Sequence, residues 1–469
     1  MDTSPPVELA ATLEHLREAW RAQPPTAAQR LRDLGCLREV LRRRLPELVA
    51  TMGEDFGRRS VHESLLTDGM TVLHEIDHVR ARLTRWMRSR RRLADWMFLP
   101  AHTEVQVKPL GVIGVIAPWN YPVNLALIPL VAAIAAGNHV MLKPSEHTPR
   151  TSALLRDILA EVFPESRVAT VLGDAEVAAR FAALPFDHLF FTGSTEVGRK
   201  VMAAAAPNLT PVTLELGGKS PAIVAPGYPL ATAAQRIAAG KFLNAGQTCI
   251  APDYVLVPQS QQAAFVAALR VYVERHYPEL AASPDYTSIV NASHYARLQA
   301  LVDEARAAGA EIITLPDATA HDAERRIFAP TVIVDPDPGL RVMQDEIFGP
   351  ILPVLGYASV EEAIAFVNAR PRPLALYHFD HDGARTRRVL GATIAGGVTV
   401  NDAVLHFAQS ELPFGGVGPS GMGHYHGHAG FLAFSKQMPV MYQARWSAMA
   451  LLRPPYRGFA DFMTKLLTR

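Results

Sequence analysis

The sequence predicts an α/β protein built around a doubly wound parallel sheet. Short apolar segments alternate with helical ones between residues 111 and 206, and again between residues 254 and 379. Strands that are apolar along their whole length are typical of parallel sheets with helices on both faces. The chain has 469 residues, of which 49% are hydrophobic and 19% charged, so it can fold into two or three lobes with a large core.

Composition and charge narrow the class of protein. The formal net charge is only +1, which predicts no nucleic-acid partner. The segment Met1-Asp-Thr-Ser-Pro-Pro lacks the basic region and apolar run of a secretory signal, and no apolar run reaches the ~20 residues that a membrane span needs. There are only two cysteines, Cys36 and Cys249, so we expect no disulfide framework and a cytoplasmic protein.

Residues 8–98 are expected to be helical. Apolar side chains recur at steps of three and four from Leu31 to Met52 and from Leu65 to Trp86. The arginine runs at 38–44 and 80–92 could bind an anionic partner, but acidic residues flank both, and we interpret them as solvated helix faces. Cys36 lies in this region without an acid–base partner nearby in the sequence, and we expect it to be structural.

The alternating segments follow in order. Residues 103–108 alternate like an exposed strand, whereas residues 111–117 are apolar like a buried one. The first alternating region predicts helices at 125–136, 152–162, 176–184 and 197–206, and strands at 139–143, 168–172 and 188–192. The second predicts helices at 262–272, 295–308 and 360–368, and strands at 254–257, 311–314, 331–334, 352–355 and 374–379.

Cys249 is the first candidate for a reactive group. A lone cysteine is usually a small buried hydrophobe, but Cys249 follows an apolar, helix-like run (233–243) and an Ala-Gly-Gln-Thr turn. Backbone N–H groups in such a place can point at a thiol, and we expect them to lower its pKa. Glu215 lies upstream in Leu214-Glu-Leu-Gly-Gly-Lys219, and Glu346 lies downstream in Glu346-Ile-Phe-Gly-Pro350.

These three stretches, in this order, resemble the aldehyde dehydrogenase superfamily. The resemblance extends over nearly the whole chain, from about Asp55 to the segment Pro-Phe-Gly-Gly-Val-Gly-Pro-Ser-Gly at 413–421. Within the superfamily, the chain looks most like the class 3 branch and its coniferyl aldehyde dehydrogenase relatives. The narrower match is carried by Asp55-Phe-Gly-Arg-Arg-Ser60, Leu184-Pro-Phe-Asp-His188 and Ala251-Pro-Asp-Tyr254.

The resemblance implies a division into domains. Residues 1–98 and 118–215 would form the NAD-binding domain, and residues 216–400 the α/β catalytic domain. A strand arm used for oligomerisation would combine residues 99–117 with 434–444. For this branch the arm implies a homodimer, with a tetramer as the alternative.

The tail at 445–469 is expected to form a helix. After Pro454-Pro455, apolar residues fall at helical spacing: Phe459, Phe462, Met463, Leu466 and Leu467. Three roles stay open. The helix could simply pack, it could touch a membrane surface weakly through the nearby Arg457, Lys465 and Arg469, or it could cover the mouth of the substrate tunnel, aimed there by the stiff diproline.

The cofactor site is expected at the end of the strand 188–192. Gly193-Ser-Thr-Glu-Val-Gly198 begins a helix there, so that Gly193, Ser194 and Gly198 suit a pyrophosphate at the positive helix end. The spacing differs from the common G-x-G-x-x-G fingerprint, but it matches the variant of the superfamily.

Further cofactor residues are implied by the resemblance alone. Lys143 and Glu146 match positions that bind the adenosine ribose, Glu346 and Phe348 match positions that hold the nicotinamide ribose, and Trp119 belongs to the same site. A carboxylate at Glu146 would accept a hydrogen bond from a ribose hydroxyl and would repel a 2′-phosphate. We therefore expect NAD, with NADP as the alternative, since relatives with such a glutamate can use both.

The resemblance also implies the chemistry. Cys249 would attack the aldehyde to give a thiohemiacetal, hydride would leave to NAD, and a thioester would remain. Asn120 and the backbone N–H of Cys249 would stabilise the oxyanion, and Glu215, with a pKa raised by its apolar surroundings, would activate the deacylating water. Asn120 could instead be a turn residue and Glu215 a structural acid.

The expected product is a free carboxylic acid. Relatives that pass the acyl group to coenzyme A typically lack the glutamate found here as Glu215. The expected substrate is an aromatic aldehyde of the coniferyl type or a medium-chain aldehyde. The alternatives are an acyl-transferring or NADP-preferring relative, or a scaffold-like member without activity, although such a member has no reason to keep Cys249, Glu215, Asn120 and Glu346 together.

A metal site is not expected. His424, His426 and His428 alternate as zinc ligands on a strand can. No carboxylate or cysteine cluster accompanies them in the sequence, and related chains carry a similar Tyr-His-Gly segment without metal.

Overall fold

The computed structural model describes residues 9–317, 320–456 and 458–468. Four N-terminal helices come first: α1 (Leu9–Ala22), α2 (Ala27–Phe56), α3 (Val61–Ser64) and, after a short π-helical segment (Leu65–Met70), α4 (Thr71–Trp86). The Thr26 hydroxyl caps α2 by accepting a hydrogen bond from the Gln29 backbone N–H, and Gly57 ends it with a φ of 80°. The expected helical region ends early, because residues after Trp86 leave the core and Arg90–Arg92 form a strand, β1.

A six-stranded sheet forms the first lobe, in the order β15-β7-β6-β3-β4-β5. Its strands are β3 (Val112–Ile116), β4 (His139–Lys143), β5 (Val168–Thr170), β6 (His188–Thr192), β7 (Val212–Glu215) and β15 (Gly421–Met422). Only β15 pairs antiparallel to its neighbour. The connecting helices are α5 (Asn124–Ala136), α6 (Pro149–Val162), α7 (Ala175–Ala182) and α8 (Thr195–Ala205). Every residue of α5 is buried, which explains why its sequence is apolar on all sides.

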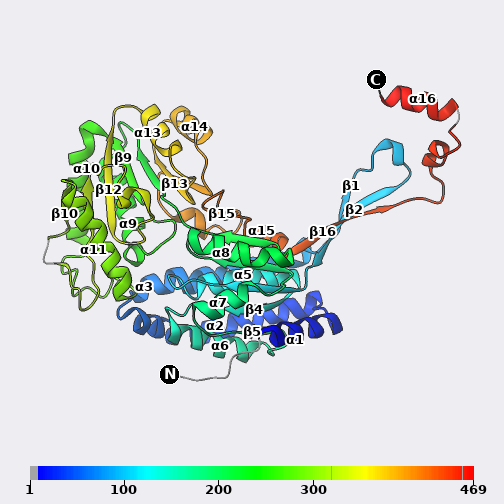
Figure 1. The fold of residues 1–469 in the computed structure, drawn as a ribbon, viewed down its shortest axis with the longest axis horizontal. Coiled ribbons are helices and arrows are strands. Elements are labelled where there is room, and N and C mark those ends of the chain that lie inside the picture. Colours follow the sequence, from blue (N-terminus) through cyan, green and yellow to red (C-terminus); the bar gives the residue numbers. More distant parts are fainter. Residues whose placement is uncertain (1–8, 318–319, 457, 469) are drawn as a thin grey trace.

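A seven-stranded sheet forms the second lobe, in the order β10-β11-β12-β9-β8-β13-β14. Its strands are β8 (Pro221–Val224), β9 (Tyr254–Pro258), β10 (Glu311–Thr314), β11 (Thr331–Val334), β12 (Ile351–Tyr357), β13 (Ala375–Phe379) and β14 (Gly397–Val400). All neighbours are parallel except β10 and β11. The helices are α9 (Leu230–Phe242), α10 (Gln262–His276), α11 (Ala292–Ala307), α12 (Arg341–Gln344), α13 (Val360–Asn368) and α14 (Gly383–Ala392). Figure 1 shows the two lobes side by side.

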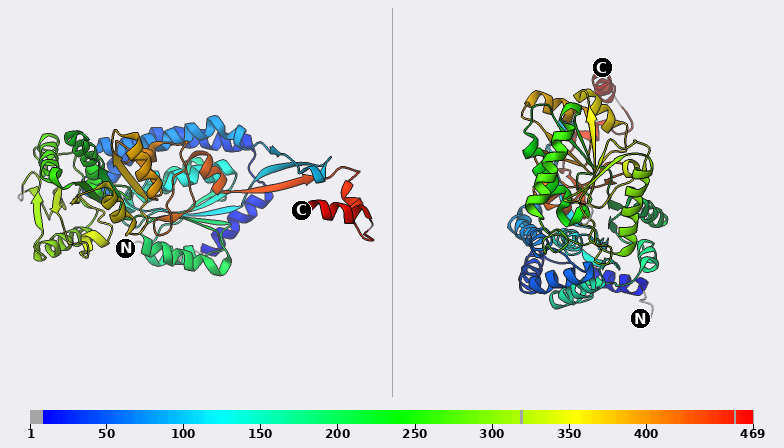
Figure 2. Two further views of the ribbon diagram at one scale, coloured as in Figure 1. Left: turned by 90° about the horizontal axis from the view of Figure 1, so that it is seen from above. Right: turned by 90° about the vertical axis from the view of Figure 1, so that its left-hand side faces the viewer.

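A three-stranded arm projects from the first lobe (Figure 1, Figure 2). In it β2 (His102–Pro109) pairs antiparallel with β1 and, from His102 to Pro109, with β16 (Ser435–Tyr442), which follows the short helix α15 (Gly427–Ala433). The predicted arm segment 99–117 extends too far toward the C-terminus, since the arm strand β2 ends at Pro109. Residues 112–116 form β3 inside the six-stranded sheet, because all five side chains are apolar or glycine and buried, whereas the side chains of β2 are mostly half-exposed.

The tail does not lie over the pocket of its own chain. Its helix, α16 (Gly458–Leu467), lies at the far end of the arm, next to a short 3₁₀ turn (Ala448–Leu452) (Figure 1, Figure 2). Within a single chain the helix therefore does not cover the cavity, and its role as a cover over a substrate tunnel stays a prediction. Phe459, Phe462, Leu466 and Leu467 are exposed there, and Arg457 and Arg469 lie outside the described residues. Among the described helices, none is long and apolar enough to cross a membrane.

A buried ion pair ties the segment after α2 to the first lobe. Arg59 donates to the Asp68 carboxylate at 2.9 Å and to the Asn120 carbonyl at 2.7 Å, and neither charged side chain is exposed. The other oxygen of Asp68 accepts hydrogen bonds from the backbone N–H groups of Val123 and Asn124, where α5 begins. One carboxylate thus neutralises a buried cation and caps a buried helix.

Replacing Arg59 by Met should destabilise the protein strongly, because Asp68 would be left buried without its partner. We expect a loss of about 3–5 kcal/mol in the free energy of urea unfolding. Arg38→Met is the matched control, since the Arg38–Asp77 pair is partly exposed and such pairs contribute less than about 1 kcal/mol. Equal losses of unfolding free energy in the two variants would show that the buried Arg59–Asp68 pair stabilises the protein no more than the partly exposed Arg38–Asp77 pair does.

Candidate active site

The candidate site lies where the carboxyl ends of parallel strands meet, facing the second lobe. The segment Pro118–Asn120 follows β3, Gly193 follows β6, and Glu215 ends β7. These residues open into a cavity of about 720 Å³, which is also lined by residues of the second lobe. Eight predicted site residues line it: Trp119, Asn120, Gly193, Ser194, Glu215, Cys249, Glu346 and Phe348. Ligands of open parallel sheets bind at this edge.

Three predicted residues do not line the cavity. Lys143 ends β4 with its ammonium group 2.8 Å from a carboxylate oxygen of Glu146. Gly198 lies in the first turn of α8, where an added Cβ would come within 2.6 Å of the Leu216 side chain. In this structure Gly198 therefore allows close packing of α8 on Leu216, the residue that follows β7.

The Cys249 loop has an unusual backbone. Directly after α9, Asn244, Ala245 and Gly246 have φ values of 52°, 51° and 74°, three left-handed residues in a row. A Cβ on Gly246 would lie 2.3 Å from the Gly349 carbonyl oxygen, so only glycine fits. The loop therefore packs directly against the turn that carries Glu346 and Phe348.

Buried amides hold this loop in place. The Gln247 side chain donates to the carbonyls of Asn244 and Ser288 and accepts from the Val290 N–H. The Asn120 amide nitrogen donates to the Gln247 carbonyl at 3.1 Å, and the Asn244 amide donates back to the Asn120 carbonyl at 3.0 Å. An amide nitrogen has two N–H groups, so Asn120 keeps one for an oxygen atom in the cavity.

Burial and two nearby carboxyls disfavour ionisation of the Cys249 thiol. Burial, followed by the nearby carboxyls of Glu346 and Glu215, raises its pKa to about 12, although backbone N–H groups of Cys249 and Ile250 act in the opposite direction. The expectation of a lowered pKa is therefore wrong. The backbone donors are present as predicted, but the loss of solvent and two acidic neighbours outweigh them.

The two acidic neighbours are themselves destabilised as anions. Burial and then the Asp253 carboxylate raise the pKa of Glu346 to about 8. Burial raises the pKa of Glu215 well above its usual range, as the sequence predicted. Neither oxygen of Glu215 has a hydrogen-bond partner among the described residues. With a pKa of about 8, Glu346 is mostly protonated at neutral pH. A raised pKa makes Glu215 a stronger proton acceptor, which suits a general base.

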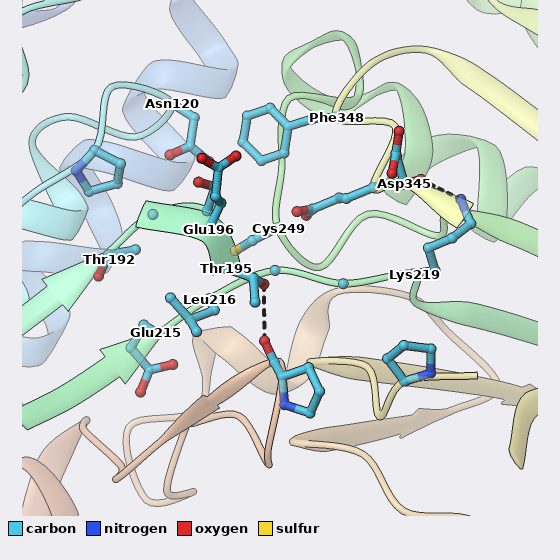
Figure 3. Close-up of a pocket in the computed structure, with 18 of the residues that line it drawn as sticks. Asn120, Thr192, Thr195, Glu196, Glu215, Leu216, Lys219, Cys249, Asp345 and Phe348 are labelled. Atoms are coloured by element: carbon cyan, nitrogen blue, oxygen red, sulfur yellow. Dashed lines mark hydrogen bonds between the residues drawn. The ribbon is translucent and has the colours of Figure 1, made fainter. Parts of the chain in front are cut away.

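The side chains converge from both lobes. In the view of Figure 3, Cys249 lies between Asn120 and Phe348 on one side and Glu215 on the other. The Glu215 carboxyl points away from the Cys249 sulfur in this view. Trp119 stacks edge-on against Phe348 at 5.3 Å and against His294 at 5.0 Å, which closes one wall of the cavity.

A buried charge cluster fixes the Glu346 turn, and sequence reasoning missed its role. The Lys219 ammonium group binds Asp253 at 2.6 Å and the carbonyls of Val342 and Asp345. The Asp253 carboxylate accepts a hydrogen bond from the Ile347 N–H, and the Lys241 ammonium nitrogen lies 3.6 Å from an Asp253 carboxylate oxygen. Lys219 and Asp253 occur in quoted motifs, but nothing in the sequence indicated that they pair. Arg297, which donates to the Ile347 carbonyl at 2.6 Å, gave no signal.

A nicotinamide dinucleotide fits the residues present. The N-terminus of α8 opens into the cavity, Thr192 has a buried hydroxyl without a partner among the described residues, and Glu346 has one such carboxyl oxygen. Burial would raise the pKa of Glu146, but the hydrogen bond and charge of Lys143 lower it, so Glu146 is an anion suited to accept from a sugar hydroxyl.

The three alternating histidines have separate environments. His426 is buried, His424 is exposed, and His428 lies with its Nε2 2.7 Å from Arg90. Within the described ranges, no cluster of His, Cys, Asp and Glu could hold a metal ion.

Comparison with known proteins defines the class. The profile of the aldehyde dehydrogenase family matches residues 8–440. The chain therefore belongs to the aldehyde dehydrogenase family, and it is an enzyme that oxidises aldehydes with NAD(P). The recognition from the three motifs, the fold class and the enzyme class are confirmed.

Two relatives narrow the comparison. A probable coniferyl aldehyde dehydrogenase of Pseudomonas aeruginosa is 50% identical over 464 residues, which cover 98% of this chain and 97% of the relative. Aldehyde dehydrogenase family 3 member A2 of Rattus norvegicus is 41% identical over 432 residues, with 92% and 87% covered. Similarity to coniferyl and class 3 enzymes is thus confirmed.

Two solved structures share the fold. The substrate-bound AldH of Staphylococcus aureus is 36% identical with a TM-score of 0.93, and the match covers 97% of this chain and 99% of that one. The aldehyde dehydrogenase of Mycobacterium tuberculosis in complex with NAD+ is 26% identical with a TM-score of 0.82, covering 93% and 90%.

The suppression of the thiol can be tested without cofactor. Glu346→Gln removes a charge that raises the Cys249 pKa. In a Cys36→Ser background, alkylation of Cys249 by iodoacetamide at pH 9–10 should become about three- to tenfold faster, corresponding to at most about one pKa unit. The effect should appear only above about pH 8, where Glu346 is ionised.

Glu196→Gln is the matched control. Glu196 lines the same cavity, but its side chain is 76% exposed and screened by solvent, so the alkylation rate should not change. A Glu346→Gln variant with the wild-type rate at every pH would contradict the electrostatic account.

Proposed function

We propose that this enzyme is a hydrolytic aldehyde dehydrogenase that uses Cys249 as nucleophile, Glu215 as general base and Asn120 as oxyanion donor. The observation that carries the proposal is their convergence in one cavity. A thiol, a buried carboxyl without a partner among the described residues, and an amide with a free N–H all line it.

The residues act in sequence. The Cys249 thiol gives its proton to solvent water, and the sulfur then adds to the aldehyde carbon. The carbonyl oxygen becomes an oxyanion that accepts hydrogen bonds from the Asn120 amide and the Cys249 N–H. A nicotinamide dinucleotide held by Glu346, Phe348 and the start of α8 would supply the acceptor for the hydride that leaves the adduct, and a thioester on Cys249 would remain. Glu215 then takes a proton from water as the water oxygen attacks the thioester carbon. The C–S bond breaks, the leaving sulfur takes the proton from Glu215 to restore the thiol, and the carboxylic acid leaves.

Two variants separate the two half-reactions. Cys249→Ala should bind NAD but lose at least about 10³-fold in NADH formation, because no adduct can form. Glu215→Gln should give a burst of about one NADH per site and then stall as an acyl-enzyme that mass spectrometry detects. Aldehyde oxidation by Cys249→Ala above a trace would remove the nucleophile assignment, and the absence of both burst and adduct in Glu215→Gln would place Glu215 earlier in the reaction.

NAD is the proposed cofactor. The Lys143–Glu146 pair at the end of β4 supports this choice, since the anionic Glu146 would repel a 2′-phosphate. Glu146→Gln should raise kcat/KM for NADP relative to NAD by about tenfold, with a smaller loss for NAD. An unchanged ratio would contradict the role of Glu146 in cofactor choice.

The proposed substrates are aromatic aldehydes of the coniferyl type, with medium-chain aldehydes as the second class. The first class is supported by the name of the similar Pseudomonas aeruginosa enzyme, a probable coniferyl aldehyde dehydrogenase. The two free cysteines support a reducing compartment, the cytoplasm.

A homodimer is proposed from the arm. Met438, Met441 and Tyr442 on β16 are exposed in a single chain, and the seven-stranded sheet ends at β14, where Val398 and Val400 are also exposed. Covering such apolar strand edges with a second copy would bury them. The tail at the end of the arm would contribute to this contact, with a membrane surface as the alternative.

A further inference from the structure

Glu63 is a partly buried acidic residue that the proposed reaction does not use, although it contacts the loop that carries Cys249. It lies in α3, where its backbone N–H donates to the Ser60 hydroxyl at 3.3 Å. One oxygen of its carboxyl group, Oε2, accepts a hydrogen bond from the backbone N–H of Asn244 at 3.0 Å. A side chain from the N-terminal helices therefore holds the start of the Cys249 loop.

Asn244 is a residue at which the loop needs an outside partner. The helix α9 ends at Phe242, and Asn244 is the first of the three left-handed residues, with a φ of 52°. Asn244 is fully buried, and a buried N–H without a partner costs free energy. Left-handed residues other than glycine are unfavourable as well, and they persist where neighbouring contacts hold them. Glu63 supplies such a contact at the first strained residue.

Thr287 orients the Glu63 carboxyl group. The Thr287 hydroxyl donates to the same oxygen, Oε2, at 3.1 Å, and it accepts from the Ser60 N–H at 3.2 Å. Thr287 is buried, and it belongs to the segment whose Ser288 carbonyl accepts from the Gln247 side chain. A hydroxyl has one proton to donate. Because Thr287 donates it to Glu63, the carboxyl group is held with Oε2 facing the loop.

The groups around Glu63 allow it to accept hydrogen bonds in either protonation state. Burial raises the pKa of Glu63 to about 7, and the Asp285 carboxylate acts in the same direction. The Asn244 N–H, the Arg59 guanidinium and the Thr287 hydroxyl act in the opposite direction. The acid and the carboxylate are therefore both populated near neutral pH. A proton on Oε1 leaves Oε2 free to keep both of its hydrogen bonds.

The side chain of Asn244 links this contact to the oxyanion donor. Its amide nitrogen donates to the Asn120 carbonyl at 3.0 Å and to the Gln247 carbonyl at 3.2 Å. The Asn120 amide donates to the same Gln247 carbonyl, two residues before Cys249. A shift of Asn244 would therefore move Asn120 relative to Cys249.

We propose that Glu63 is a positioning residue for the Cys249 loop: by holding the Asn244 N–H, it fixes where the Cys249 sulfur lies relative to the Asn120 amide. The inference rests on the proposed roles of Cys249 and Asn120. Glu63 is not among the described residues that line the cavity, so it would touch neither aldehyde nor cofactor. Its effect should appear in the rate of the chemical step, which depends steeply on the placement of the reacting groups, and not in cofactor binding.

Glu63→Met tests this in the full-length enzyme with NAD and benzaldehyde, since methionine keeps the bulk of the side chain and removes the acceptor. The rate of NADH formation in the first turnover should fall about tenfold, whereas KM for NAD should stay within about twofold of wild type. Glu63→Gln should keep the first-turnover rate within about threefold of wild type, because its amide oxygen can still accept from the Asn244 N–H.

Asp187→Leu is the matched control. Asp187 is also partly buried, and it accepts a hydrogen bond from the Val112 N–H at 2.7 Å. Val112 begins β3, whereas the cavity lies beyond the other end of that strand. The control should therefore lower thermal stability without changing the first-turnover rate.

Two outcomes overturn the proposal: a Glu63→Met variant that loses only stability, and a Glu63→Gln variant as slow as Glu63→Met. If Glu63→Met does not fold, Glu63→Asp replaces it, because its carboxyl group is withdrawn from Asn244 by one methylene. A wild-type first-turnover rate in Glu63→Asp then overturns the proposal. Cys249→Ala, run in parallel, shows separately whether Cys249 is the nucleophile.

Discussion

The buried amide cluster around Gln247 is the constraint on which the rest of the site depends. Asn244, Gln247 and Asn120 bind each other's backbone groups, and Arg59 binds the same Asn120 carbonyl. Each of these groups is inside the protein, where an unpaired donor or acceptor costs about 1–3 kcal/mol. The cluster therefore admits one arrangement of the loop, in which Cys249 faces the cavity and Asn120 from the first lobe lies beside it.

The same burial that fixes the loop sets the chemistry. The pKa values of Cys249, Glu215 and Glu346 are all raised, because burial removes the water that would stabilise their anions. Burial thus disfavours the anion of each of the three groups, which limits charge repulsion between them. The reaction needs a thiolate at one step and a carboxylate at another. Raised pKa values make both anions more reactive, because a less stable anion binds a proton or attacks a carbon more readily.

Local patterns predicted much of the fold. The strands 139–143, 188–192, 311–314 and 331–334 and the helix 360–368 agree with the structure residue by residue, since uniformly apolar runs and capped helices are local signals. The end of the arm, the place of α16 and the thiol pKa could not be predicted in this way. Each depends on contacts between segments far apart in the chain: β3 with β4 and β6, the tail with the arm, and Cys249 with two carboxyls.

The central claim is that one cavity between the two lobes binds both the cofactor and the aldehyde, next to the Cys249 sulfur. A crystal structure of the Cys249→Ala variant with NAD and an aromatic aldehyde tests it most directly. The account predicts the nicotinamide beside residue 249, the diphosphate at the start of α8, and the aldehyde oxygen within hydrogen-bond distance of the Asn120 amide. An aldehyde bound elsewhere, or a cofactor that leaves Glu346 and the α8 terminus untouched, would contradict it.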